Sequence, residues 1–525
     1  MLIAGLSDKV FGPFGCLLRV SAPMGKKRRR ENLRAEGQTA FRMSGEANEN
    51  ITISAGVPWA VEHVFEHFML GDVLDVLKRE QGTAVSDALK VLVAQSMQMV
   101  GMSVNAMEAA ASDPRTAELT GTGVFSQQDL YRTIGRVGEN SDAIVRHLCS
   151  CLKGIDGIGM DTVFTDWTSM CFDAQTNRIV RFGHSRDHRP DLPQVMVGLS
   201  VDKETGMPVG LTVNRGNMLD VTHFSLTFAQ IRPFLDEGTM IVFDNGAYSK
   251  DNVQMVRDAG CDFLSRLELN SSDLEKTMNS KGWEMPEEAE GMMCRKEKGS
   301  LGVYRYMFFS HARKEDAFRM NRSKAERDYD EMQEMKLALA EGKKPRKKHR
   351  HRNIFVKTTL SHSFPLDVFD RREAVNEAVK RMRTGREGFF MLVSSKDMTP
   401  WDALTMYRSR NDVEANMKDL KHGIDWRPAR STNPESVKGR ILIAFLSLFI
   451  VSYIRWKCPD ASAKTADSIV KELTSLSVTG IYENGKVKKR IYSNFSPLIR
   501  SMIAGLPMLV GQKQPPNKHP AQTKA

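Results

Sequence analysis

Cysteine is scarce in this chain and forms no metal-binding pattern. The 525 residues include seven cysteines, and no two of them have C-x-x-C spacing. An odd number of cysteines in a chain of this length argues against a disulfide framework, and the missing C-x-x-C spacing argues against a cysteine-based zinc site. We therefore expect free thiols in a reducing cytoplasm.

We expect neither a secretory signal nor a membrane-spanning segment. Residues 1–23 are mildly apolar, but their charged residues follow the apolar part instead of preceding it. The longest apolar run, residues 441–454, is interrupted by Ser447 and Ser452 and is too short to span a bilayer. This run predicts a buried helix, and no membrane partner is expected.

Acidic residues are outnumbered by basic ones. Lys and Arg together number 75 against 64 for Asp and Glu, which gives a formal net charge of +11. The basic residues concentrate in two clusters, residues 26–30 (K-K-R-R-R) and residues 343–352 (K-K-P-R-K-K-H-R-H-R). This charge favours a polyanionic partner, nucleic acid before membrane. The alternative for each cluster is a solvated tail.

Short β-rich segments after residue 160 predict a mixed α/β fold. Strands are predicted at residues 162–172, 194–201, 207–213, 238–243, 261–267 and 388–394, and helices at 220–235 and 249–259. The order is a hairpin meander followed by parallel crossovers. This is the order of a ribonuclease H-like mixed sheet, which we expect to form the core.

The composition divides the chain into six segments. We expect a basic, flexible segment (1–50), an α-helical region that is a candidate for holding DNA ends (51–155), the first part of a ribonuclease H-like catalytic core (156–270), a charged insertion (271–385), the second part of the core (386–456) and a C-terminal segment with a disordered tail (457–525).

One short motif in the helical region resembles a metal site. His63, Glu66 and His67 have the H-x-x-E-H spacing of inverted zinc proteases. No third ligand is visible beside them, so a chance match is favoured over a zinc site.

Two aspartates occupy unusual places in the predicted strands. Asp166 lies in the middle of the first strand, where β-propensity disfavours an aspartate. Asp244 follows the strand at 238–243, at the end where open α/β sheets bind ligands. In this strand order the first and fourth strands are neighbours, so we expect Asp166 and Asp244 to lie side by side. The alternatives are a capped or ion-paired Asp166, simple turn chemistry at Asp244, and Asp161 as a rival carboxylate that faces the other side of the strand.

A third carboxylate lies in residues 407–421, which read Y-R-S-R-N-D-V-E-A-N-M-K-D-L-K. If this stretch is one helix, Tyr407, Arg410, Glu414 and Lys421 fall within an arc of roughly 60°. The apolar residues then cluster on the adjoining face. The alternative is a solvated charged face with a few i,i+4 pairs.

Three carboxylates brought together repel one another unless cations lie between them. Asp166, Asp244 and Glu414 therefore predict a site for hard divalent ions that prefer oxygen ligands, Mg²⁺ or Mn²⁺. Two such ions roughly 4 Å apart would activate a water or a 3′-hydroxyl and stabilise the leaving oxygen of an in-line phosphoryl transfer.

The spacing Tyr407-x2-Arg410-x3-Glu414-x6-Lys421 resembles a known signature. It is similar to the Y-R-E-K motif of DDE transposases of prokaryotic insertion sequences, in the class named after insertion sequence four. Residues 183–194 (G-H-S-R-D-H-R-P-D-L-P-Q) resemble the segment between the first two carboxylates of that family. The Asn and Gly that follow the second aspartate here resemble its turn.

The resemblance implies a DNA transposase that recognises terminal inverted repeats and joins them to target DNA. Asp166, Asp244 and Glu414 would be the metal-binding catalytic triad. Contacts to the phosphates of the element's end would come from the signature residues Tyr407, Arg410 and Lys421. Relatives act as a homodimer on paired ends, in a synaptic complex, and a prokaryotic member would work in the cytoplasm on the nucleoid.

The chain departs from the family at one point and leaves alternatives open. The better-known relatives have a largely β insertion before the Glu, whereas residues 321–352 here predict a charged helix. Arg186, His188 and Arg189 either contact DNA phosphates or belong to a surface turn. The alternative functions are a DNA-binding protein that has lost catalysis and a structure-specific nuclease on the same fold.

Overall fold

The chain forms two compact units, Met1–Thr239 with Asn411–Ala525, and Met240–Arg410. A computed structural model describes residues 49–77, 84–98, 104–172, 176–187, 189–269, 275, 281–285, 291–299, 302–342, 353–358, 362–363, 370–422 and 433–506. Both basic clusters, the C-terminal tail and nearly all of the predicted flexible segment 1–50 lie outside these residues. The six segments predicted from composition stay a prediction.

The helical part of the first unit is built around α17 (Pro434–Lys457). The helices α2 (Gly56–His67), α4 (Val85–Gln98), α7 (Gln127–Glu139) and α8 (Ser141–Gly154) surround it. By length and composition α17 is the one described helix that could cross a membrane, but 83% of its apolar window is buried inside the protein. The buried helix predicted at 441–454 is therefore confirmed. Shorter helices complete this part: α3 (Leu70–Asp75), α5 (Val104–Ala111), α6 (Pro114–Thr120), α18 (Ala466–Ser475), α19 (Pro497–Gly505) and the 3-10 turn η4 (Pro459–Ala461).

Two glycines let α7 and α17 cross in backbone contact. A Cβ atom on Gly138 of α7 would lie 1.8 Å from the carbonyl oxygen of Glu435, and one on Gly439 of α17 would lie 1.9 Å from the carbonyl oxygen of Ile134. Both obstacles are backbone atoms, which cannot turn aside as a flexible side chain can. Only glycine fits at this crossing, and the burial of α17 depends on it.

We expect Gly138→Ala to destabilise the first unit by at least about 1–3 kcal/mol, because the added methyl group forces the two helices apart. Gly135→Ala is the matched control, since it lies on the same helix with nothing within 4 Å of its Cβ position. Alanine forms helices better than glycine, so this control should be neutral or stabilising. Urea denaturation of both variants measures the difference in stability. Equal unfolding midpoints for Gly138→Ala and Gly135→Ala would show that the helix crossing does not require glycine at position 138.

The first unit also carries the predicted meander. The strands β2 (Thr162–Cys171), β3 (Gln194–Asp202) and β4 (Pro208–Arg215) pair antiparallel in sequence order. Every residue of β3 is buried, because α9 (Asp220–Ile231) covers β3 and β4 and α16 (Asn411–His422) packs on β2 and β3. The 3-10 turn η1 (Arg232–Phe234) follows α9. A separate antiparallel sheet, which the sequence did not suggest, contains β1 (Glu49–Ser54), β12 (Ser477–Glu483) and β13 (Lys486–Ser493).

The second unit is a mixed sheet with one parallel pair. The strand β5 (Met240–Phe243) pairs parallel with β6 (Asp262–Leu267), and α10 (Lys250–Asp258) connects them. Next comes β11 (Phe389–Ser394), antiparallel to both β6 and β8 (Tyr304–Ser310), and β7 (Met292–Lys298) follows at the edge. The helix α15 (Pro400–Arg408) packs on β6, β7 and β8. The strands and helices predicted between residues 162 and 267, and the strand at 388–394, are confirmed within a few residues at their ends.

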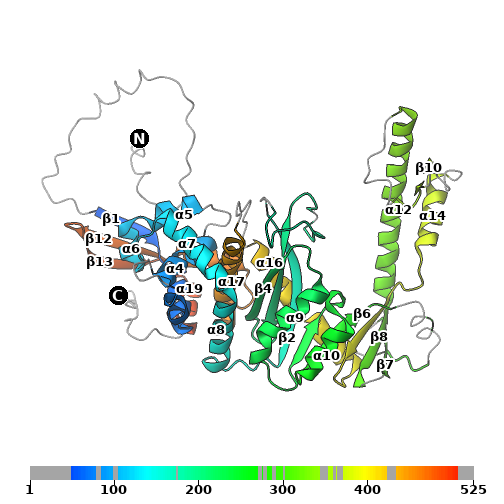
Figure 1. Cartoon of the computed structure of the whole chain (residues 1–525), viewed down its shortest axis with the longest axis horizontal. Coiled ribbons are helices and arrows are strands. Elements are labelled where there is room, and N and C mark those ends of the chain that lie inside the picture. Colours follow the sequence, from blue (N-terminus) through cyan, green and yellow to red (C-terminus); the bar gives the residue numbers. More distant parts are fainter. Residues whose placement is uncertain are drawn as a thin grey trace, which may run out of the picture. The chain divides into compact units, whose positions relative to one another are not determined.

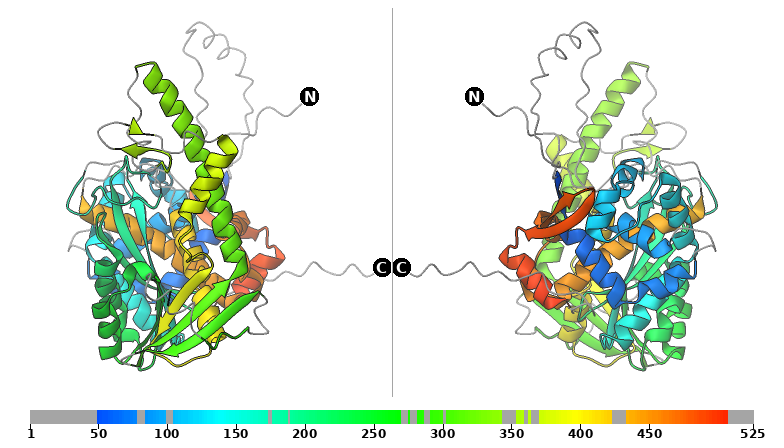
Figure 2. Two further views of the ribbon diagram at one scale, coloured as in Figure 1. Left: turned by 90° about the vertical axis from the view of Figure 1, so that its right-hand side faces the viewer. Right: turned by 90° about the vertical axis from the view of Figure 1, so that its left-hand side faces the viewer.

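Residues 271–385 contribute both sheet strands and a helical pair. Besides β7 and β8 they form α12 (His311–Ala340), α14 (Arg371–Met382) and the short strands β9 (Lys357–Thr358) and β10 (His362–Ser363). The helices α12 and α14 run side by side in every view (Figure 1, Figure 2). Of the helix predicted at 321–352, residues 321–340 are helical, residues 341–342 form a turn, and residues 343–352 lie outside the described residues.

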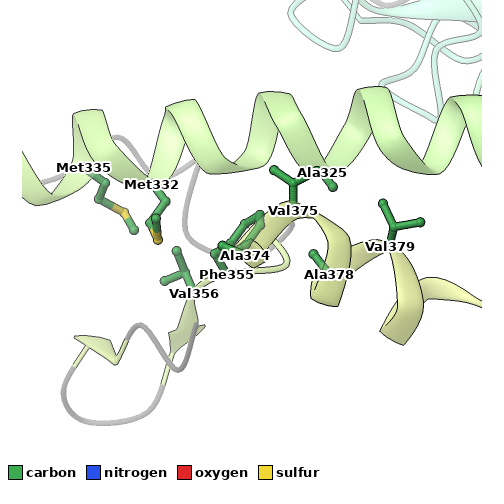
Figure 3. Close-up of a cluster of buried hydrophobic side chains, with 9 residues drawn as sticks. All are labelled: Ala325, Met332, Met335, Phe355, Val356, Ala374, Val375, Ala378 and Val379. Carbon is green, nitrogen blue, oxygen red and sulfur yellow. The ribbon is translucent and has the colours of Figure 1, made fainter. Parts of the chain in front are cut away.

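A small apolar core joins this helical pair. Alanine and valine side chains of α14 point toward α12, and Phe355 lies next to Ala374 at the start of α14 (Figure 3). The small side chains let the helix backbones approach closely. The buried members are Ala325, Met332, Met335, Phe355, Val356, Ala374, Val375, Ala378 and Val379. The pair therefore has a core of its own, distinct from the sheet's.

Candidate active site

The prediction that residues 407–421 form one helix is wrong. The helix α15 ends at Arg408 and α16 begins at Asn411. At the break the Ser409 hydroxyl donates to the carbonyl of Thr405 at 3.0 Å, and the Arg410 N–H donates to the carbonyl of Tyr407 at 3.3 Å. Short polar side chains in the sequence S-R-N-D compete for backbone hydrogen bonds and favour such a break.

The break divides the signature between the two units. Tyr407 and Arg410 belong to the second unit, and Glu414 and Lys421 to the first. A common 60° arc on one helix therefore does not exist.

In the second unit, three of the predicted residues meet. Asp244 directly follows β5 and precedes the 3-10 turn η2 (Asn245–Ala247). The Tyr407 hydroxyl donates to Asp244 Oδ1 at 2.9 Å, and Arg410 Nη1 lies 3.8 Å from Oδ2. The Arg410 guanidinium also lies over the Tyr407 ring, 5.4 Å from its centroid. The carboxylate is thus held by side chains from a distant segment, since Tyr407 lies 163 residues after Asp244.

These neighbours keep Asp244 ionised. Burial alone would raise the pKa of its carboxyl group, but the charge of Arg410, the backbone N–H of Asn245 and the Tyr407 hydroxyl outweigh burial and lower the pKa below its ordinary value. Burial and the nearby carboxylate raise the pKa of Tyr407 far above its ordinary value, although Arg410 opposes this. Tyr407 is therefore a protonated donor at neutral pH.

The Asp244 carboxylate has the chemistry of a divalent-metal ligand. It is anionic, it offers oxygen atoms, and 45% of the side chain is exposed. Taken alone, neither unit groups three His, Cys, Asp or Glu side chains that could hold a metal ion, within the described residues. The expected triad draws its members from both units, since Asp166 and Glu414 belong to the first.

Asp166 lies in the middle of β2, opposite Leu199 of β3. Its side chain is half-buried, and Oδ1 accepts a hydrogen bond from the backbone N–H of Trp167 at 2.9 Å. The rival carboxylate, Asp161, is exposed and precedes the strand. The choice of Asp166 over Asp161 as the first carboxylate stays a prediction.

In α16, Glu414 is exposed, while Val413, Met417 and Leu420 are buried where the helix packs on the sheet. Lys421 Nζ forms an ion pair with Asp187 Oδ1 at 2.5 Å. The apolar face of this helix is therefore as predicted. The partner of Lys421, however, is a carboxylate that the sequence did not single out.

Most cations expected to contact DNA in residues 183–194 also have acidic partners. Arg186 is paired with Asp220, and Arg189 Nη2 lies 2.8 Å from Asp191 Oδ2. His188 lies outside the described residues. Asp187 and Asp220 were missed because no local pattern reveals an ion pair between distant segments; only the polar composition of the loop hinted at them.

The H-x-x-E-H motif has another use. His67 Nε2 lies 3.1 Å from Asp156 Oδ2, and Lys457 Nζ lies 2.8 Å from the other oxygen of that carboxylate. His63 is buried, and burial followed by the charge of His67 lowers its pKa to about 4. No third ligand joins the two histidines among the residues that the structure describes. His67 thus shares a carboxylate outside the motif with Lys457.

Replacing Tyr407 by Phe removes one donor to Asp244. We expect the pKa of Asp244 to rise and the free energy of unfolding to fall by about 1 kcal/mol at neutral pH. The folded-state pKa of Asp244 lies below its unfolded value, so the carboxylate stabilises the fold fully above the ordinary carboxyl range and loses this effect as pH falls through the folded-state pKa. The difference in the free energy of unfolding between Tyr407→Phe and wild type should therefore become smaller at acid pH.

Urea denaturation at neutral and acid pH measures this difference. Tyr492→Phe, at an exposed tyrosine of β13, is the matched control and should leave stability unchanged at both pH values. A deficit in Tyr407→Phe that persists unchanged in acid would show that the hydroxyl does not act through Asp244.

Comparison with known proteins identifies a family and structural relatives. A family model described as the Transposase DDE domain matches residues 159–450, which is more than half of the chain. Among solved structures, the chain is similar to the piggyBac transposase in a synaptic complex with hairpin DNA, at 11% identity and a TM-score of 0.39, over 81% of this chain and 80% of that one. No curated protein matches the chain.

Proposed function

The chain belongs to the Transposase DDE domain family, and we propose that it is a DNA transposase that cuts the terminal inverted repeats of an insertion sequence and joins them to target DNA with divalent metal ions. We assign it to the class named after insertion sequence four. The partners are the two element ends and the target duplex, held by a homodimer in a synaptic complex.

One observation carries the proposal: an ionised carboxylate at the end of a buried strand is held by the tyrosine and the first arginine of the signature. Tyr407 and Arg410 converge on Asp244. A transposase needs an anionic oxygen ligand at this end of the sheet, where ligands of α/β proteins bind. The same contact explains why the signature contains a hydroxyl donor three residues before an arginine.

In this proposal Asp166, Asp244 and Glu414 are the ligands of two Mg²⁺ or Mn²⁺ ions. Bound divalent ions supply an activated water or 3′-hydroxyl and stabilise the leaving oxygen of the phosphodiester. The protein's part is to keep the ligands ionised and oriented. Tyr407 restrains one oxygen of Asp244, and the N–H of Trp167 restrains one oxygen of Asp166.

Arg410 has a second role in the proposed reaction. Its Nη1 atom stands 3.8 Å from Asp244 Oδ2, so its positive charge faces that carboxylate. A DNA phosphate offers a bidentate partner for such a guanidinium. Arg410 thus lowers the charge repulsion between the carboxylate and the DNA backbone.

Glu414→Gln and Asp244→Asn test the triad. Each should lower strand cleavage by at least about 10³-fold in Mg²⁺, because the amide is a poor ligand for a hard cation, while binding to the DNA that flanks the gene persists. Gel mapping of cleaved ends and fluorescence anisotropy measure the two properties.

Glu373→Gln on α14 and Asp251→Asn on α10 are matched controls at exposed helix positions, and both should cleave like wild type. Undiminished cleavage by Glu414→Gln would overturn the triad. Cleavage without joining to a second DNA would instead identify a nuclease on the same fold.

The Asp187–Lys421 ion pair makes a separate prediction. If Lys421 contacts a DNA phosphate, DNA must compete with Asp187 for the ammonium group. Asp187→Asn should then raise affinity for flanking DNA about twofold to fivefold, the range of a surface ion pair. The control Asp236→Asn removes the carboxylate partner of Lys153 in the same way and should leave the affinity for flanking DNA unchanged. Equal affinities of the two variants would remove Lys421 from the DNA contacts.

A further inference from the structure

The topology of the second unit brings several chain segments to one edge of its sheet. The parallel strands β5 and β6 end there, and so does β8, because β11 runs antiparallel between β6 and β8. Asp244 follows β5, and α12 begins directly after β8. Carboxyl ends of strands are where α/β sheets bind ligands.

Arg266 is the neighbour of Asp244 at this edge. Phe243 pairs with Ser265, so the next residues along the parallel strands, Asp244 and Arg266, lie in register and on the same face. The positive charge of Arg266 lowers the pKa of both Asp244 and Tyr407. The Arg266 side chain is itself exposed.

Arg313 reaches the same face from the first turn of α12. Its guanidinium lies 4.3 Å from the centroid of the Phe390 ring. Phe390 lies two residues from Leu392, the partner of Arg266, and so shares the face of Arg266. The ring fixes the direction of the guanidinium, while the side chain keeps contact with solvent.

Arg408, at the end of α15, completes the group. Burial, and then the positive charges of Arg266 and Arg408, lower the pKa of Arg313, so both of these guanidinium groups lie within electrostatic reach of Arg313. None of the three forms an ion pair in the part of the chain that the structure describes. By contrast, Arg319 further along α12 is paired with Asp316.

Three converging cations that form no ion pair among the described residues repel one another and stabilise an anion placed between them. The first turn of α12 adds the positive end of a 30-residue helix. The guanidinium groups match the oxygens of a phosphate, and Phe390 holds one of them in place.

We propose that Arg266, Arg313 and Arg408 form a phosphate-binding site that takes the DNA backbone beside the bond on which Asp244 acts. The ligand class is a phosphodiester of duplex DNA. The inference rests on the proposed function and deepens it, because it assigns part of the DNA contact to residues outside the signature. One of them, Arg313, comes from the segment between β8 and β11. The site positions DNA and takes no part in the chemistry.

Salt dependence of DNA binding tests the site directly. The probe is a fluorescent duplex made from the DNA that flanks the gene, titrated with full-length protein at several salt concentrations without divalent ions. Arg313→Gln should weaken binding about threefold to tenfold and lower the slope of log affinity against log salt by about one, as one phosphate contact is lost. Arg266→Gln and Arg408→Gln should behave alike, and Arg313→Lys should recover most of the slope.

Arg319→Gln is the matched control, because it removes an exposed, ion-paired arginine from the same helix and should leave affinity and slope unchanged. Thermal unfolding checks that each variant folds. A slope for Arg313→Gln equal to that of Arg319→Gln overturns the phosphate site. The readout needs no cleavage: if wild type does not cut DNA in Mg²⁺ but the slopes still differ, the proposed function fails while the binding site stands.

Discussion

A carboxylate at the end of a buried strand must be kept ionised although it has lost part of its hydration, and this constraint organises the second unit. Asp244 meets it with donors that arrive 163 residues later in the chain. The break between α15 and α16 serves this arrangement, because Tyr407 ends a helix and Arg410 lies in the turn after it. The boundary between the two units then falls directly after Arg410, inside the signature.

Two groups of cations among the described residues differ in how they would meet DNA. Lys421 and Arg186 are neutralised by Asp187 and Asp220. A phosphate must displace a carboxylate to reach them, so they contribute little net positive charge while DNA approaches the protein. Arg266, Arg313 and Arg408 have no such partner among the described residues. Long-range attraction of DNA therefore depends more on this second group, since a paired charge is largely cancelled at the distance of a Debye length.

Local patterns predicted the central strands well and the contacts between distant segments poorly. The run T-V-F-T-D-W-T-S-M-C of β2 is β-branched and aromatic, and its strand was predicted almost to the residue. The helix break at Ser409 was missed because helical spacing of apolar residues continues beyond it in α16. The strand β13, K-V-K-K-R-I-Y-S, was missed because it is mostly exposed and has no alternating pattern. Asp187 was missed for a different reason: its partner, Lys421, is 234 residues away.

The helical insertion is attached to the sheet at both ends, and this gives it a direct effect on the site. The helix α12 continues from β8 through Ser310, whose hydroxyl accepts from the N–H of Arg313 at 3.3 Å. The chain returns from α14 to β11, the strand that carries Phe390. Because α12 and α14 share a core, the two helices pack as one body whose first turn carries Arg313. Arg313 therefore connects the helical pair to the edge where Asp244 lies, and through the proposed phosphate site the insertion would contribute directly to DNA binding there.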